Sequence, residues 1–291
     1  MPSFDNKKQL RFIITLGTEK FGSSNDNQII LQGFRAGVDI DKAGGVQMGT
    51  MRARIYGVKQ DDMNSITTLQ WRPQYRIFNT VDVYAIDGEV ETLVFSGNIV
   101  NAWGDYQNPP DVFLHIQAQA AFKNQVSATT PLSIKGGIDV AIVMQRIAGE
   151  MGLAFENNNV HVMLNDVYVS NTLLEQARDL ARAANFRLHI DDKILAITNI
   201  YEPRQGDIPR IASDTGLVGY PTFDGVGVNF RTLFNPAIRF GGAISLETSN
   251  KHANGQWIVT SISHSLESER PDGPWYSQVR GTAGNIAVVS R

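Results

Sequence analysis

Cysteine is absent from the sequence, so disulfides, thiolate metal sites and thiol catalysis are excluded. An excess of basic charge is also missing. The 26 basic and 29 acidic residues give a net charge of -3, which provides no basic face for holding nucleic acid tightly. Such a balance would suit a surface past which nucleic acid must slide.

Long apolar runs are scarce too. Residues 12–16 are too short for a signal-peptide core, and no run approaches the roughly 18 apolar residues of a membrane span. We therefore expect a protein that is made in the cytoplasm and does not insert into a membrane. The 291 residues suffice for two or three domains, and a hydrophobic content of 42% supports a sizeable core.

The first part, residues 1–122, shows the period-2 alternation of β-strands. Many short strands with glycine between them predict a sandwich or barrel. The spacing of Met63, Ile66 and Leu69 predicts one short helix over residues 61–70. The alternating runs are residues 48–56, 79–86, 91–100 and 111–118.

The middle part, residues 123–202, predicts a compact α+β insert. Apolar residues from Val140 to Met151 follow a helical spacing, and Gly152 is placed to end that helix. A second helix begins at Thr172, where Thr-Leu-Leu-Glu fits a capping box. A hairpin over residues 186–197 follows, with its turn at Asp191-Asp192-Lys193.

The last part, residues 203–291, returns to β structure and contains a long hairpin over residues 256–283. Its pattern of strand, proline-containing turn and strand has a sparse counterpart in residues 96–120. The ungapped match aligns Ile99 with Ile262 and Ala120 with Ala283. Any two hairpins with proline turns share such a pattern. The alternative is that two similar β modules flank the insert, so that a trimer would present six modules in a ring.

Catalytic, cofactor-binding and metal-binding residues are not indicated. The five histidines lie on separate elements without metal-ligand spacing, and no Gly-x-Ser-x-Gly elbow occurs. The acidic pairs Asp61-Asp62 and Asp191-Asp192 are interpreted as turn formers, because adjacent side chains point apart. Trp275 and Tyr276 follow a proline turn on opposite strand faces, so one ring fits the core and the other a subunit interface. A sandwich packed on both faces explains the pair equally well.

A β module, a helical insert and a second β module follow one another over most of the chain, and stretches in all three parts are similar to one known family. The similar stretches are residues 53–57, 98–99, 111–113, 173–184, 186–197, 236–240, 243–246, 254–264 and 274–281. In these stretches and in the order of its parts, the sequence resembles the baseplate hub proteins of contractile-tail phages, the late control protein D family.

The resemblance implies a structural virion protein of the tail baseplate and not an enzyme, with no cofactor. It implies a mainly β fold: two tube-like antiparallel β-barrel modules, at residues 1–122 and 203–291, flanking an α+β insert of two helices and a hairpin. A homotrimer would form a pseudo-sixfold adaptor between the sixfold tail tube protein and the threefold central spike protein, with the tape measure and other baseplate proteins as further partners. Nucleic acid would only pass through its channel. The length implies that no lysozyme-like segment is fused to it.

Three alternatives stay open. A hub or spike component of a bacterial contractile secretion device would share the same modules. A cell-wall-cleaving enzyme would need two carboxylates converging in one cleft. A carbohydrate-binding β module would need an exposed aromatic platform.

Overall fold

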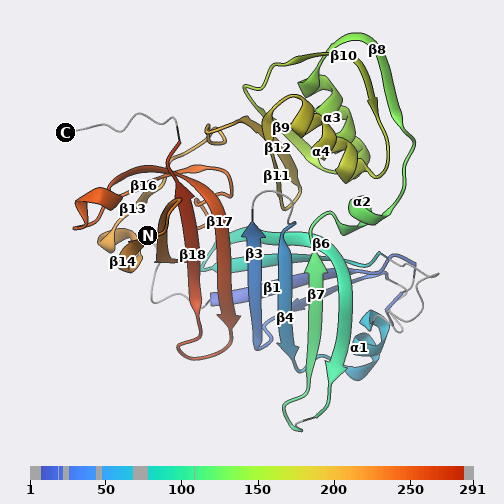
Figure 1. Ribbon diagram of the computed structural model, residues 1–291. Helices are drawn as coiled ribbons and strands as arrows, with labels where there is room; N and C mark the ends of the chain where they lie inside the picture. The colour runs from blue at the N-terminus through green and yellow to red at the C-terminus, as the bar shows by residue number, and fades with distance from the viewer. Residues whose placement is uncertain are drawn as a thin grey trace.

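Strands dominate the computed structural model, which describes residues 8–18, 20–21, 26–43, 48–67, 78–107 and 109–284 (Figure 1). This confirms a mainly β fold with a small α+β insert. The first module contains β1 (Lys8–Thr15), β2 (Gln28–Gln32), β3 (Ala36–Ala43), β4 (Thr50–Tyr56), α1 (Gln60–Ile66), β5 (Thr80–Asp87), β6 (Val90–Asp105) and β7 (Phe113–Gln119). The predicted helix over residues 61–70 is confirmed as α1, and its last three residues lie outside the described part.

Strand β6 bends the sheet of the first module over its core. Its first half pairs with β5 and its second half with β7, with a bulge between Ile99 and Asn101. In Figure 1 it curves from the layer of β3, β4 and β7 into the layer of β5 and β1. The alternating apolar side chains of both layers, such as Phe12, Ile55 and Leu114, fill the space between them.

The insert contains α2 (Phe122–Val126), β8 (Leu132–Asp139), α3 (Val140–Met151), β9 (Ala154–Asn158), β10 (Met163–Val169), α4 (Leu173–Ala183), β11 (Phe186–Asp191) and β12 (Ile194–Asn199). Both predicted helices and the hairpin are confirmed. Gly152 ends α3 with a φ of 74°, a left-handed conformation that favours glycine. The Thr172 hydroxyl accepts a hydrogen bond from the Glu175 N–H at the start of α4.

The third module contains β13 (Arg210–Ile211), the 3-10 helix η1 (Ser213–Thr215), β14 (Leu217–Phe223), β15 (Gly227–Leu233), β16 (Ala243–Leu246), the 3-10 helix η2 (Lys251–Ala253), β17 (Gly255–Ser268) and β18 (Trp275–Thr282). The long hairpin predicted over residues 256–283 is β17 and β18, paired antiparallel with a bulge between Val259 and Ser261.

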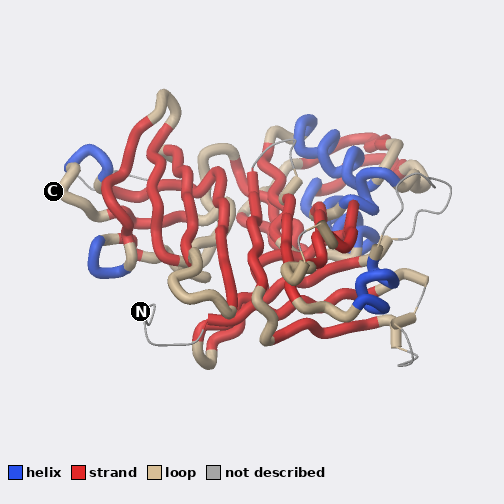
Figure 2. Tube along the Cα trace, turned by 90° about the horizontal axis from the view of Figure 1, so that it is seen from below, coloured by secondary structure: helices blue, strands red, loops and turns tan. Residues whose placement is uncertain are grey.

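The first and third modules share one sheet, because β17 pairs with β3 from Ser261 to Ser268. The path runs β14-β15-β18-β17-β3-β4-β7-β6-β5-β1-β2. Figure 2 shows strands lying side by side along the length of the molecule. The sheet does not close among the described strands, which corrects the expectation of a closed barrel in each module. The pairing of β17 with β3 occupies the edges that each barrel would need for closure.

Three apolar clusters accompany the three parts of the chain. One fills the first module and also takes in Phe234, Leu266 and Trp275. The second lies in the insert and the third in the last module. The boundaries at residues 122 and 202 remain a prediction.

The two hairpins compared in the sequence have the same build. In each, the first part of the first strand pairs with a different neighbour, β5 or β16, and a bulge interrupts the pairing with the second strand after its first two residue pairs. The structural match aligns Ile99 with Val259, because these residues precede the two bulges, and Ala118 with Gly281. The ungapped sequence match was therefore right for the second strand and three residues out of register for the first.

Candidate functional site

A continuous polar surface covers the outer side of the shared sheet. We call it the polar face and define it by two rows of side chains that cross from the third module into the first. One row is Arg231, Gln278, Ser263, Asp41, Thr50 and Gln119. The other is Leu233, Tyr276, Ser265, Asp39, Arg52, Gln117 and Asn101. Neighbours in a row are cross-strand partners, so they project from the same side of the sheet.

The charges of the polar face alternate and nearly cancel. Asp39 lies opposite Arg52 across β3 and β4, and the Ser265 hydroxyl donates to Asp39 Oδ1 over 2.8 Å across the boundary of the two modules. Most other positions carry neutral hydroxyl and amide groups. Such a surface is well hydrated and offers neither a charge of one sign nor an apolar patch to a passing molecule.

The two predicted interface residues lie on opposite sides of this sheet. Trp275 is 4% exposed and belongs to the first module's core, where its ring packs edge-on against Phe234 at 5.9 Å between centroids. Tyr276 is half-buried on the polar face, with the Arg231 guanidinium 3.4 Å above its ring centroid. Their role between subunits stays a prediction.

A buried network of charges joins all three parts of the chain, and we call it the junction network. Its members are Lys42, Glu156, Asp191, Asp192, Arg204 and Arg239. Lys42, near the end of β3, donates to Asp191 Oδ1 over 2.8 Å and to Asp192 Oδ2 over 2.7 Å at the tip of the β11–β12 hairpin.

Arg204 occupies the centre of the junction network, and its side chain is 0% exposed. It donates to both carboxylate oxygens of Glu156, each over 2.9 Å, to Asp191 Oδ2 over 2.8 Å and to the Phe240 carbonyl over 2.9 Å. Arg239, from the loop before β16, donates to Glu156 Oε2 over 2.7 Å. Nearly all hydrogen-bond donors and acceptors of these charged side chains therefore have a partner within the protein.

The pKa values of the junction network follow from this geometry. Burial alone would raise the pKa of Asp191, but the charges of Lys42 and Arg204 lower it to about 2. Burial likewise opposes the charge of Glu156, whose pKa is lowered to about 2 by its bonds to Arg204 and Arg239. Burial would lower the pKa of Lys42, yet the two aspartates raise it. Its ammonium group therefore stays protonated and does not act as a nucleophile.

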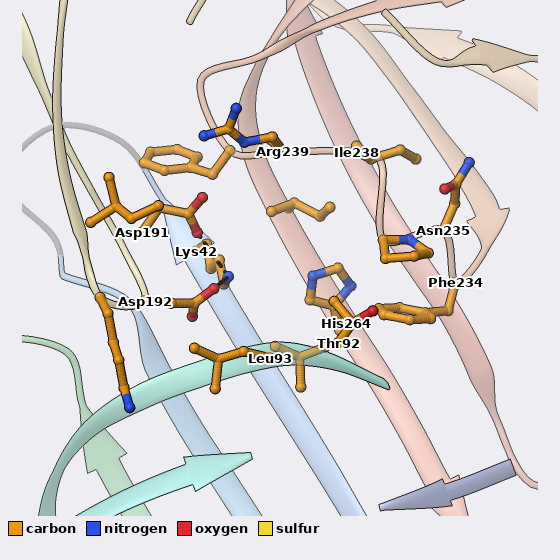
Figure 3. Close-up of a pocket in the computed structure, with 16 residues that line it drawn as sticks. Lys42, Thr92, Leu93, Asp191, Asp192, Phe234, Asn235, Ile238, Arg239 and His264 are labelled. Atoms are coloured by element: carbon orange, nitrogen blue, oxygen red, sulfur yellow. Dashed lines mark hydrogen bonds and ion pairs between the residues drawn. The ribbon is translucent and has the colours of Figure 1, made fainter. Parts of the chain in front are cut away.

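A cavity of about 310 Å³ lies beside the junction network, lined by residues of all three parts of the chain. Figure 3 shows Lys42 between Asp191 and Asp192 on one side, with His264 and Phe234 on the other. His264 donates to or accepts from the Ser277 hydroxyl at 2.8 Å. Burial lowers the pKa of His264 to about 3, so it is neutral at physiological pH.

The sequence interpretation of Asp191-Asp192 was incomplete. The pair does form a turn, with Asp192 at a φ of 55°. However, both carboxylates converge on Lys42, which lies 149 residues earlier than Asp191. Lys42, Glu156, Arg204 and Arg239 were not anticipated, because isolated charged residues give no local signal. Within the described residues, no cluster of histidine and acidic side chains could hold a metal ion, and no helix has the length and apolarity of a membrane span.

Comparisons with known proteins give one family and several similar folds. The family model described as "Baseplate hub gp41" matches residues 22–281. No curated protein matches the sequence. The 43 kDa tail protein of prophage MuSo2 from Shewanella oneidensis has a TM-score of 0.61 at 10% identity, covering 94% of this chain and 96% of that one.

Two further solved structures have similar folds. A tail protein from Neisseria meningitidis MC58 has a TM-score of 0.60 at 9% identity, with 93% and 96% of the two chains covered. The Escherichia coli c3393 protein, described as a component of the type VI secretion system, has a TM-score of 0.55 at 7% identity, with 87% and 74% covered. At these identities the likeness concerns the fold alone.

Proposed function

The chain belongs to the baseplate hub gp41 family, and from this premise we propose that it works as a trimeric adaptor at the tip of a contractile phage tail. Membership confirms the resemblance drawn from the sequence, and it makes the chain a structural component of the tail. The finer proposal is that three copies form a pseudo-sixfold ring. The ring binds the sixfold tail tube protein on one side and the threefold central spike protein on the other.

The sheet shared by the two β modules is the observation that carries this proposal. Two hairpins of the same build, β6–β7 and β17–β18, occur in one chain and are linked through the pairing of β17 with β3. Each chain therefore supplies two similar wall segments, and three chains supply six. An odd number of subunits can in this way match both a sixfold and a threefold partner.

We assign the polar face to the channel side of the ring. A channel that conducts nucleic acid or an unfolded protein needs a wall that neither binds nor repels its cargo. The alternating charges and neutral side chains of this face meet that need, and no catalytic group is required for it. The interfaces with neighbouring subunits would then lie at the two ends of the sheet. Tyr276, which lies next to Leu233 near the β14–β15 end of the polar face, is the residue that we assign to such an interface.

Native mass spectrometry of the purified chain, followed by imaging of tails assembled with the tube protein, tests the proposal. We expect a mass of three chains and a ring with a central channel at the tail tip. A chain that stays monomeric, and is absent from the tip of intact tails, would contradict it.

The hub of a bacterial contractile secretion device is the second candidate. It is favoured by the fold shared with the Escherichia coli type VI secretion protein and with a Francisella PdpA–VgrG complex, whose TM-score is 0.59 at 7% identity. The chain spans 59% of that complex's matched chain. Binding to a phage tail tube protein and not to a secretion-device tube protein separates the two candidates.

A further inference from the structure

The polar face changes character along the strand ends that lie away from the insert. Strand β7 runs toward α2 of the insert, and β3 ends beside the junction network, so the start of β7 and the end of β4 lie at the opposite rim, at the bottom of Figure 1. We call this part of the surface the aromatic rim. Its members are Arg35, Arg54, Tyr56, Trp103, Phe113 and His115.

Four rings form one continuous patch on the aromatic rim. Trp103 stacks on His115 with 4.7 Å between the ring centroids, and Phe113 packs edge-on against His115 at 4.8 Å. Tyr56 follows at 5.0 Å from Phe113. Each ring is half-buried and lies an even number of positions from a polar-face residue of its own strand. The patch therefore shares the outer side of the sheet with the polar face.

Arginines border the patch, and one of them has no partner. The Arg35 guanidinium lies 4.5 Å above the Tyr56 ring centroid, and Arg270 is paired with Glu267 at 2.8 Å. Arg54 is exposed and forms no ion pair or hydrogen bond within the part of the chain that the structure describes. Its donors are therefore available to a ligand.

A small cavity of about 60 Å³ lies among these arginines, lined by Arg35, Arg54 and Arg270. Gly37 lies between Arg54 and Glu267 in the cross-strand row and has no side chain, which leaves this space open. A cavity of this size holds a few water molecules or one carboxylate group. Guanidinium groups bind carboxylates through paired hydrogen bonds, so a carboxylate is the group that fits here.

The surroundings favour a protein over a nucleic acid as the partner. Three carboxylates border the rim, from Asp105, Asp111 and Glu267. They would repel a phosphate backbone, which needs a surface with an excess of basic charge. Aromatic and arginine side chains without lysine are instead typical of the central residues of protein interfaces.

We propose that the aromatic rim binds an acidic segment of a protein partner. The segment places a carboxylate in the cavity between Arg35 and Arg54 and an apolar side chain on the neighbouring rings. This inference rests on the proposed function in one respect, because three copies would repeat the site around one opening of the channel. The partner is thereby held at the opening opposite the insert.

Fluorescence anisotropy of the purified chain with three labelled probes tests the site. The acidic probe is a peptide of four Glu-Leu-Ser repeats, the basic probe has lysine in place of each glutamate, and the third is single-stranded oligothymidine. We expect the acidic peptide to bind and the other two probes to stay free. Oligothymidine or the basic peptide binding as tightly as the acidic peptide, or no binding of the acidic peptide, would overturn the proposal.

Variants locate the binding on the rim. Arg54→Gln should weaken binding of the acidic peptide about tenfold or more, because a hydrogen-bonded charge pair is lost. Arg52→Gln is the matched control, since it removes the same charge two positions away on β4 and opposite Asp39. It should change binding by about twofold or less, and equal losses in the two variants would contradict the site.

Native mass spectrometry of the same samples separates this inference from the trimeric adaptor. A trimer that does not bind the acidic peptide overturns the site and leaves the adaptor standing. A monomer that binds the peptide through Arg54 contradicts the adaptor and supports the site.

Discussion

Replacing Arg204 by methionine should separate the insert energetically from the two β modules. Methionine keeps an unbranched apolar chain but removes every donor that Arg204 directs at Glu156, Asp191 and the Phe240 carbonyl. The position is fully buried, so water cannot take over these bonds without opening the interface.

The expected loss of unfolding free energy depends on which ion pairs of the junction network remain after the substitution. One hydrogen bond to a charged group is worth about 1.5–3 kcal/mol, so four separate bonds would suggest a very large sum. However, Lys42 still contacts Asp191, and Arg239 still contacts Glu156. The loss should therefore be near that for removing one partner of a buried ion pair, about 3–5 kcal/mol.

Scanning calorimetry measures the consequence. At about 2 °C per kcal/mol for a chain of this size, the midpoint should fall by roughly 6–10 °C. The matched control is Arg146→Met on α3, where an exposed pair with Glu150 at 3.0 Å is lost. That pair is worth about 0.3–0.5 kcal/mol, so the control midpoint should move by about 1 °C or less.

The double variant Arg204→Met with Glu156→Gln tests the reasoning further. The second change removes a carboxylate that the first leaves underpaired, so the combined loss should be smaller than the sum of the single losses. A midpoint shift for Arg204→Met no larger than that for Arg146→Met would refute the account. Strict additivity in the double variant would do the same.

Three further predictions concern acid stability, the aromatic pair and a helix cap. The folded-state pKa values of Glu156 and Asp191 lie below their ordinary values of 4.5 and 3.8, at about 2. Their contribution to stability should thus be complete above about pH 4.5 and disappear as the pH falls to about 2, as acid unfolding followed by circular dichroism would show. Trp275→Ala should lower the free energy of unfolding in urea by about 3–5 kcal/mol, because a buried ring is lost. Tyr276→Ala should leave the fold intact and weaken the trimer in native mass spectrometry. An unchanged trimer would exclude Tyr276 from the interface. Thr172→Ala should cost about 1 kcal/mol in urea unfolding by removing the cap of α4, and no loss would contradict the capping interpretation.

The elements that the sequence predicts well are those whose signals are local. Helix α3 follows from apolar spacing and Gly152, and α4 follows from the Thr172 cap. The strands follow from alternation. Each of these signals lies within about a dozen residues and concerns which side of one element is buried.

Features that join distant segments were missed for the opposite reason. The pairing of β17 with β3 connects residues more than 200 positions apart, and nothing in either strand specifies the other. The strand number predicted a sandwich or barrel and the family resemblance implied two barrel modules, but neither says which strand edges meet. For Trp275 and Tyr276, alternation puts two rings on opposite faces, and only the tertiary structure shows that Trp275 faces the core.

The junction network favours one orientation of the modules more strictly than an apolar contact would. Apolar surfaces tolerate a small slide, because burial depends on area and not on direction. Lys42, Arg204 and Glu156 come from different parts of the chain, and their bonds of 2.7–2.9 Å hold only in one arrangement. A slide of a few ångströms would leave buried charges underpaired, at a cost of several kcal/mol. We infer that the network sets the angle between the insert and the shared sheet, which the adaptor proposed above would have to keep fixed for partners on its two sides to stay in register.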